Sequence, residues 1–152
     1  MRALIQRVKR ASVTTEGIVV GTIGQGLVVL LGLTHDDDLP TVQWMAQKVL
    51  SMRIFPDEHG KMNRNVGDMG GGILVVSQFS LYANAIKGRR PNFADAAPSH
   101  IAEPLYDEFV SRCSQIHTPV ETGRFGADMD VSLVNWGPVT IWLDSEMKPR
   151  QR

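Results

Sequence analysis

The feature that most constrains the fold of this chain is an uninterrupted apolar segment at residues 26–33. It reads Gly-Leu-Val-Val-Leu-Leu-Gly-Leu, with glycines at or near both ends. A strand with one solvated face alternates apolar and polar residues, whereas a strand buried on both faces is apolar throughout. Residues 73–76, Ile-Leu-Val-Val, repeat this pattern directly after three glycines. Both segments are therefore predicted to be buried strands.

Patterns around these two runs predict the remaining elements. Residues 39–52 carry apolar side chains at helical spacing, and Pro40 suits the first turn of such a helix. A second helix is expected to open with Ser99 as its N-cap, although Pro104 favours a regular helix only from about residue 103. Further strands are predicted at residues 2–8, 18–23, 120–125, 129–134 and 139–143.

Clusters of strands separated by two helices are typical of the α+β class. With 152 residues and no internal repeat or linker, the chain is expected to form one domain. We therefore expect a single compact, β-rich α+β domain over residues 1–147, with a curved, barrel-like mixed sheet and two main helices. Residues 148–152 are expected to form a disordered tail.

The charge balance and the single cysteine narrow the possible partners and compartments. Sixteen basic and sixteen acidic residues cancel, so any nucleic-acid partner has to be bound by a local patch. No apolar run approaches the roughly 18 residues of a membrane-spanning helix, and the N-terminus does not resemble a signal peptide. Cys113 excludes an intrachain disulfide and is expected to be a buried packing residue. A cytoplasmic location is therefore predicted.

Familiar catalytic and metal-binding motifs are missing from the sequence. It has no Gly-x-Ser-x-Gly nucleophile elbow, no phosphate-binding P-loop, no His-x-x-x-His pair and no Cys-x-x-Cys pair. The three aspartates that follow His35 are interpreted as a loop that caps a helix. We therefore predict neither a metal site nor a cofactor.

Two segments beside the predicted strands allow both a functional and a structural interpretation. Residues 77–82, Ser-Gln-Phe-Ser-Leu-Tyr, follow a buried strand, where hydroxyls, an amide and backbone N–H groups either line a site or satisfy the local backbone. Residues 135–140, Asn-Trp-Gly-Pro-Val-Thr, suit either an ordinary hairpin connection or a cis-proline turn that directs carbonyls outward.

A third segment concentrates positive charge. Lys87, Arg89 and Arg90 lie within four residues, and Phe93 follows shortly after. This pattern suits either a phosphate-binding loop or a solvated basic turn.

Taken together, the three segments resemble the D-aminoacyl-tRNA deacylase family. Residues 77–82 are similar to the family's Ser-Gln-Phe-Thr-Leu-Tyr element, and residues 135–140 to its Asn-x-Gly-Pro-Val-Thr element. Further similar stretches are RALIQRV, RIFPDEHGKMN, KGRRPNF and TGRFGADMDV, in the family's order. The likeness extends from Met1 to about Asp144, which is nearly the whole chain.

The resemblance implies a homodimer that hydrolyses the ester between a D-amino acid and the terminal adenosine of tRNA, while sparing L-aminoacyl-tRNA. It also implies activity on glycyl-tRNA. The catalytic segment would be Ser77, Gln78, Phe79 and Ser80, with backbone N–H groups near Phe79 and Ser80 holding the carbonyl oxygen. The ribose 2′-hydroxyl of the substrate would assist the attacking water.

The resemblance also implies which residues control chirality. Gly137 and Pro138, joined by a cis bond, would enter the partner subunit's site and exclude the side chain of an L-amino acid. From the residues themselves, Lys87, Arg89 and Arg90 are candidates for binding tRNA locally. Phe125 is a candidate for stacking on the terminal adenosine and Met129 for the wall of the pocket, and a core role is the alternative for both.

Two positions depart from the family pattern and leave alternatives open. Ser80 stands where the family usually has threonine, which keeps the hydroxyl but loses the methyl group that stiffens χ1. Trp136 stands where the family usually has aspartate, and no role is assigned to it. The alternatives are a tRNA-end-binding module without catalysis, and a serine esterase with Ser77 or Ser80 as nucleophile.

Overall fold

The computed structural model describes residues 1–117 and 119–148, and its central element is a long N-terminal strand. In chain order the elements are β1 (Arg2–Thr15), β2 (Ile18–Ile23), β3 (Gly26–Gly32), α1 (Leu39–Ser51), β4 (Phe55–Pro56), β5 (Met62–Arg64), β6 (Gly72–Ser77), the 3₁₀ helix η1 (Phe79–Tyr82), α2 (Ser99–Ile116), β7 (Val120–Thr122), β8 (Asp130–Asp144) and the 3₁₀ helix η2 (Ser145–Met147). Apart from Lys148, the tail predicted at residues 148–152 lies outside the described residues.

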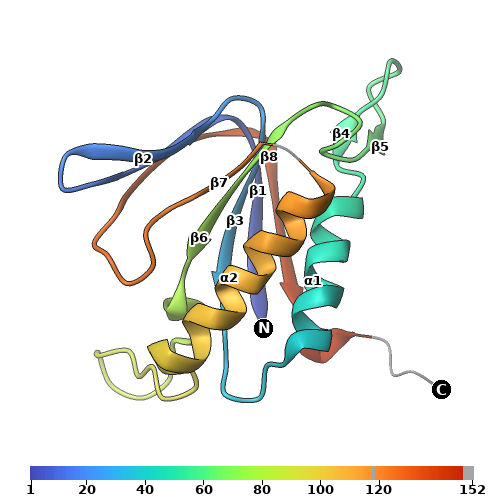
Figure 1. The fold of residues 1–152 in the computed structure, drawn as a ribbon. Coiled ribbons are helices and arrows are strands. Elements are labelled where there is room, and N and C mark those ends of the chain that lie inside the picture. The colour runs from blue at the N-terminus through green and yellow to red at the C-terminus, as the bar shows by residue number, and fades with distance from the viewer. Residues whose placement is uncertain (118, 149–152) are drawn as a thin grey trace.

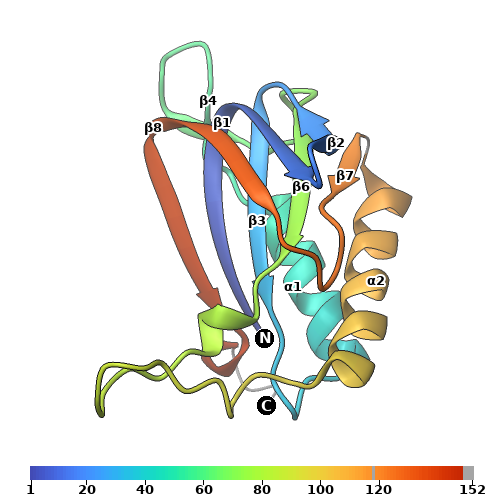
Figure 2. The ribbon, with the colours of Figure 1, turned by 90° about the vertical axis from the view of Figure 1, so that its left-hand side faces the viewer.

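Strand β1 organises the sheet because it pairs with three other strands. Its first half pairs with β3, its second half pairs with β2, and β8 pairs with it along nearly its whole length, all antiparallel. The pairings of β3 with β6 and of β6 with β7 are parallel. The mixed sheet has the order β2-β1-β3-β6-β7, with β8 added to β1, and it curves strongly (Figure 2). The predicted α+β domain with a curved, barrel-like mixed sheet is confirmed.

The two apolar runs are the interior strands β3 and β6, as predicted. Val29 and Val75 belong to the larger hydrophobic cluster, which fills the space between the sheet and the helices. Val28 and Leu74 belong to a second cluster on the opposite face. Because successive side chains of a strand point to opposite faces, a strand that separates two cores needs apolar residues at every position.

Helices α1 and α2 lie together on one face of the sheet (Figure 1). The side chain of Asp38 caps α1, because one carboxylate oxygen accepts a hydrogen bond from the Thr41 N–H at 2.9 Å. The buried residues of α1 are Val42, Met45, Ala46 and Val49. The predicted helix over residues 39–52 and the capping role of the acidic loop are both confirmed.

Helix α2 differs from the prediction at its start. Pro98, not Ser99, is the N-cap residue, and its carbonyl oxygen accepts hydrogen bonds from the N–H groups of Ile101 and Ala102 at 2.9 Å each. The helix is regular from Ser99, through Pro104, rather than from residue 103. A proline removes only one hydrogen bond here, and the stripe of buried residues that holds the helix on the sheet outweighs that loss. The stripe consists of Ala102, Tyr106, Phe109 and Cys113.

The C-terminal strands also differ from the prediction. The strands expected at residues 129–134 and 139–143 are one continuous strand, β8, so the hairpin interpretation of residues 135–140 is wrong. The ladder between β1 and β8 shifts register there, and the Asn135 amide bridges the irregularity by donating to the carbonyl oxygens of Arg7 and Val139 at 3.0 and 3.1 Å. Residues 135–140 are therefore a bulge within a strand. The strand predicted at 120–125 ends at Thr122.

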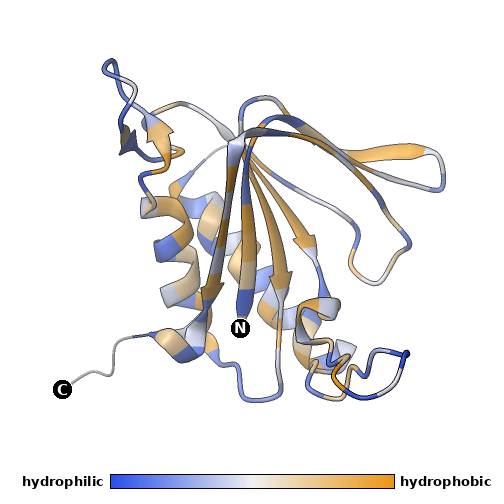
Figure 3. Ribbon diagram, turned by 180° about the vertical axis from the view of Figure 1, so that it is seen from behind, coloured by the Kyte–Doolittle hydropathy of each residue, from blue (hydrophilic) through white to orange (hydrophobic). Residues whose placement is uncertain are grey.

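Near the start of β1, the face of the sheet opposite the helices lies beyond the second cluster and is only partly covered in the described part of the chain, and we call this area the open face (Figure 3). Leu4 of β1 lies between Leu30 of β3 and Trp142 of β8 in the strand register. Ala3 and Ile5, the neighbours of Leu4 in sequence, point into the helix-covered core. Because side chains alternate along a strand, Leu4, Leu30 and Trp142 therefore lie on the open face. Trp142 is 43% exposed.

Candidate active site

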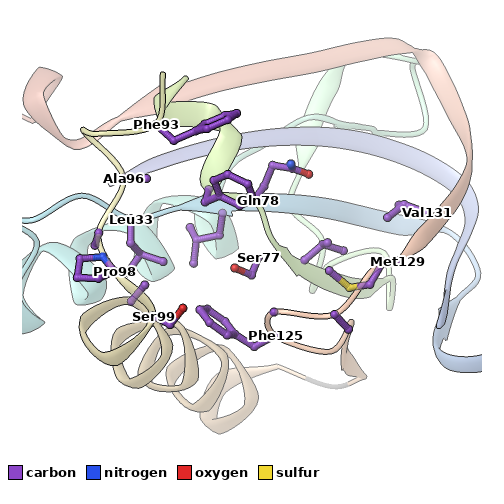
Figure 4. Close-up of a pocket in the computed structure, with 17 residues that line it drawn as sticks. Leu33, Ser77, Gln78, Phe93, Ala96, Pro98, Ser99, Phe125, Met129 and Val131 are labelled. Carbon is purple, nitrogen blue, oxygen red and sulfur yellow. The ribbon is translucent and has the colours of Figure 1, made fainter. Parts of the chain in front are cut away.

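A cavity of about 510 Å³ lies between the end of β6, the start of α2 and the loop that precedes β8. This volume is within the range of about 300–1,000 Å³ that is usual for ligand pockets. Figure 4 shows Ser77 and Gln78 between Phe93 on one side and Phe125 on the other. The predicted site residues that line the cavity are Ser77, Gln78, Phe79, Phe125 and Met129.

The end of β6 fixes the first wall of the cavity. Ser77 is the last residue of the parallel ladder between β6 and β3, and the N–H of Gln78 donates to the Leu31 carbonyl oxygen at 2.8 Å. The chain then turns into η1. A Cβ atom added to Gly32 would lie 2.9 Å from the Gln78 carbonyl oxygen, so this close approach of the two segments needs a glycine.

Helix η1 begins at Phe79, so the N–H groups of Phe79 and Ser80 are not used by hydrogen bonds inside it. Ser80 is not among the residues that line the cavity. Its hydroxyl oxygen accepts a hydrogen bond from the Gln78 amide at 2.5 Å. Ser80 therefore contacts the site through Gln78 in this structure.

Phe125 and Met129 form the opposite wall. The Phe125 ring packs against the Tyr106 ring with 5.7 Å between their centroids. Tyr106 is buried, its hydroxyl donates to the Val75 carbonyl oxygen at 2.9 Å, and burial raises its pKa. Because Val75 belongs to β6, this contact fixes the Phe125 wall relative to the Ser77 wall. Val131, which the sequence did not single out, completes this side.

The described residues that line the cavity include no titratable side chain. Serine hydroxyls, one amide and backbone groups supply the polar atoms, and the remaining surface is apolar. Such a cavity can orient a substrate and stabilise a developing oxyanion through backbone N–H groups. It offers no side chain that could act as a general base.

The basic segment lies outside the cavity, in an exposed loop between η1 and α2. Asn84 and Asn92 exchange backbone hydrogen bonds of 2.8 Å, which closes the loop that carries Lys87, Arg89 and Arg90. Phe93 follows immediately and does line the cavity, where its ring meets the Phe79 ring edge-on. The sequence did not predict this aromatic contact.

Gly137 and Pro138 are exposed on β8 and do not line the cavity of their own subunit. Gly137 has a φ of +130°, which favours glycine. Behind it lies Arg7, only 7% exposed, which the sequence did not single out. Its guanidinium donates to the carbonyl oxygen of Trp136 at 3.0 Å and to that of Ile54 at 2.6 Å. Burial lowers the pKa of Arg7.

Trp136, to which no role was assigned, packs within its own subunit. Its ring meets Phe55 edge-on with 6.1 Å between centroids, and the Lys9 ammonium lies 3.6 Å from its centroid. The Arg7 guanidinium lies 4.5 Å from the same centroid. Cation–π contacts of this kind contribute about 0.5–2 kcal/mol each. Trp136 therefore helps to hold the bulge that presents Gly137 and Pro138.

The described residues, 1–117 and 119–148, contain no cluster of three or more His, Cys, Asp or Glu side chains that could hold a metal ion. None of their helices is both long and apolar enough to cross a membrane.

Known proteins with similar sequences carry the name suggested by the motifs. The family model for D-Tyr-tRNA(Tyr) deacylase matches residues 4–144. A D-aminoacyl-tRNA deacylase of Thermomicrobium roseum is 59% identical over 145 residues, which are 95% of this chain and 94% of the relative. A D-aminoacyl-tRNA deacylase of Citrobacter koseri is 57% identical over 143 residues, which are 94% of this chain and 99% of the relative.

Solved structures show the same architecture. One, described as c-Myc DNA Unwinding Element Binding Protein, has a TM-score of 0.89 and 41% identity, and covers 95% of this chain and 98% of its own. A second, described as a probable eukaryotic D-amino acid tRNA deacylase, has a TM-score of 0.76 at 17% identity over 93% of this chain and shows the shared fold. With the family model matched over residues 4–144, this chain belongs to the D-Tyr-tRNA(Tyr) deacylase family.

Proposed function

We propose that this protein hydrolyses D-aminoacyl-tRNA, cleaving the ester between a D-amino acid and the terminal adenosine to release the free amino acid and tRNA. The observation that carries this proposal is the cavity whose wall is formed by Ser77, Gln78 and Phe79, with aromatic and apolar surface opposite. Membership of the deacylase family supports it. Hydrolysis of an activated ester suits a site of this kind, because an aminoacyl ester needs little acid or base assistance from side chains.

In the proposed reaction, the oxygen of a water molecule bonds to the ester carbonyl carbon and the bond from that carbon to the ribose oxygen breaks. One water proton passes to the leaving ribose oxygen, and the other leaves with the carboxylic acid product. A backbone N–H group at Phe79, which lines the cavity, stabilises the negative charge that develops on the carbonyl oxygen. Losing one donor of this kind typically raises the barrier by about 2.7–4 kcal/mol. The 2′-hydroxyl of the substrate orients the water, as the family resemblance implies.

A serine acyl-enzyme is the less favoured alternative. A serine hydroxyl needs an adjacent base to become a nucleophile, and none of the described cavity-lining side chains is one. The Ser80 hydroxyl accepts a hydrogen bond from the Gln78 amide, an interaction that does not increase its nucleophilicity. Retained turnover by Ser77→Ala and Ser80→Ala variants would exclude this alternative.

Control of chirality is proposed to come from Gly137 and Pro138 of a partner subunit. In the sheet, β1 and β3 separate β8 from β6. Val131 is the residue of β8 that lines the cavity, and Gly137 is six residues further along this strand, a separation of about 20 Å. The exposed backbone of Gly137 and Pro138 therefore suits insertion into a second copy of the cavity. A rigid backbone wall there excludes an L side chain by steric overlap, whereas glycine passes, so glycyl-tRNA is also a substrate.

The open face of the sheet is the surface on which we place the second copy. Leu4, Leu30 and Trp142 form an apolar strip on this face, and Trp142 shares strand β8 with the exposed Gly137 and Pro138. A two-fold interface uses the same surface on both subunits, so one contact supplies both cavities with a Gly-Pro segment. In the same complex, Lys87, Arg89 and Arg90 contact tRNA phosphates, and Phe125 and Met129 contact the terminal adenosine.

The decisive experiment compares the release of D-tyrosine and of L-tyrosine from the corresponding tyrosyl-tRNAs by the folded protein. The proposal expects turnover of the D-ester and sparing of the L-ester. Equal hydrolysis of both, or binding of tRNA without turnover, would contradict it. The second outcome would instead support the alternative of a tRNA-end-binding module.

A mixing experiment tests the contribution of the partner subunit. A Pro138→Ala variant and a Gln78→Ala variant are each expected to lose selective activity. When the two variants associate at random, about half of the dimers contain one chain of each. Each mixed dimer has one intact site of its two, so roughly a quarter of the wild-type activity should return. No recovery, although subunit exchange is shown with labelled chains, would contradict the arrangement.

A further inference from the structure

Two aromatic rings at the mouth of the cavity are left exposed. Phe79 and Phe93 lie with 4.9 Å between their ring centroids and an interplanar angle of 66°. Phe79 is 57% exposed and Phe93 is 39% exposed. Apolar side chains grouped at the rim of a concave site are typical of a surface that binds a partner or ligand. This pair, the rim aromatic pair, comes from two different segments that meet only in the fold.

The rim aromatic pair is separate from the aromatic residue inside the site. Phe125 lies on the opposite side of Ser77 and Gln78 and packs on the buried Tyr106 (Figure 4). The ester of a single nucleoside contains one base, and Phe125 already offers a stacking surface for it. A second aromatic surface fits a second base, because any nucleobase can stack on an aromatic side chain.

The basic loop makes a nucleotide the best match for this surface. Phe93 directly follows Asn92, whose backbone hydrogen bonds to Asn84 close the loop that carries Lys87, Arg89 and Arg90. Arg90 is three residues from Phe93, a separation of at most about 11 Å along an extended chain. Cations beside stacking rings form the combination that binds unpaired nucleic acid, with the rings on the bases and the cations on the phosphates.

From these contacts we infer that the rim aromatic pair binds the base of the nucleotide that precedes the terminal adenosine, and that the basic loop holds the intervening phosphate. The inference rests on the proposed function and narrows its substrate to an unpaired 3′ end of RNA. The protein then recognises at least two nucleotides, although only one of them carries the ester.

The test compares three substrates with the same amino acid: D-tyrosyl adenosine, the D-tyrosyl ester of cytidylyl-adenosine, and D-tyrosyl-tRNA. For the wild-type protein, kcat/KM is expected to rise about tenfold from the nucleoside to the dinucleotide, which equals about 1.4 kcal/mol. Phe93→Ala should lower kcat/KM for the dinucleotide ester to the value for the nucleoside ester, so that the ratio of the two falls from about ten to about one. Phe93→Tyr should retain the gain, because the ring remains.

Ile86→Ala is the matched control, since Ile86 lies in the same loop, is exposed, and is not aromatic. It should retain the dinucleotide gain. Replacing Lys87, Arg89 and Arg90 together by glutamine should also remove the gain and reduce the salt dependence of tRNA turnover. Urea unfolding and sedimentation of each variant show whether the fold and the oligomeric state are unchanged.

Three outcomes would overturn the inference. A wild-type protein that hydrolyses the nucleoside and dinucleotide esters equally well has no second base site. A Phe93→Ala variant that loses activity on the nucleoside ester contacts the amino acid or the terminal adenosine instead. A Phe93→Ala variant that dissociates has lost a contact between subunits. By contrast, a wild-type protein inactive on all three D-esters would contradict the proposed function itself.

Discussion

Replacing Gly137 with alanine should destabilise the folded protein by about 2.5–6 kcal/mol, because two independent penalties add at this position. The first is backbone strain. Gly137 has a φ of +130°, a conformation that a residue with a Cβ atom adopts at a cost of about 1–3 kcal/mol. The second is a collision, since the added Cβ would lie 2.6 Å from Nη2 of Arg7.

The collision is costly because Arg7 cannot move freely. Its guanidinium is buried and donates to the carbonyl oxygens of Trp136 and Ile54. Displacing it breaks at least one hydrogen bond of a charged donor, worth about 1.5–3 kcal/mol. Added to the strain, this loss is a large share of the 5–15 kcal/mol by which a domain is usually stable.

Urea unfolding of the wild-type and Gly137→Ala proteins at one fixed concentration measures the difference, and the fixed concentration allows for subunit association. Gly60→Ala is the matched control. Gly60 has a φ of +77°, but an added Cβ there meets no atom within 4 Å, so only strain of about 1–2 kcal/mol is expected. If both variants lost the same free energy of unfolding, the argument from contact with Arg7 would be refuted.

Three other perturbations have defined outcomes. Tyr106→Phe removes the hydroxyl donor to the Val75 carbonyl oxygen, which keeps its hydrogen bond from the Gly123 N–H at 3.0 Å, so urea unfolding should show a loss of about 0.5–1.5 kcal/mol. Burial raises the pKa of the Cys113 thiol to about 12, so a disulfide reagent should react with it only after unfolding, and this residue's contribution to stability should fall as pH rises above about 9. Asp38→Ala should cost about 1 kcal/mol of unfolding free energy through loss of the helix cap. Because hydrogen bonds from the Thr41 hydroxyl and N–H lower the pKa of Asp38, that difference should shrink as pH falls below the ordinary value of 3.8.

Sequence reasoning predicted the interior of the fold well, because buried strands leave a direct signal in hydropathy. It was wrong where tertiary contacts outweigh local preference. Pro104 argued for a late start of α2, but the buried faces of Tyr106 and Phe109 hold the helix on the sheet from Ser99 onward. Gly137 and Pro138 favoured a turn between two separate strands, but pairing with β1 continues on both sides of them, so the strand is continuous.

The candidate site shows a similar division. Ser77, Gln78, Phe125 and Met129 were each named from motifs, and the structure brings them to one cavity. The contact between Phe79 and Phe93 depends on how the loop folds back, which no local pattern describes. Arg7 did leave a signal that was missed. In β1, every second residue from Ala3 through Ile5 to Arg7 lies on the buried face. This alternation predicts that the charged side chain of Arg7 is buried.

Strand β8 has one further consequence, which concerns solubility. In the described part of the chain it pairs with β1 alone, so a strand of 15 residues leaves one edge without a ladder. Such edges recruit other strands and lead to aggregation. Pro138 stands near the middle of β8 and has no N–H to donate, and the bulge around it distorts the edge. The Gly137-Pro138 segment, which is proposed to exclude L-amino acids, therefore also interrupts the unpaired edge of β8 and limits aggregation through it.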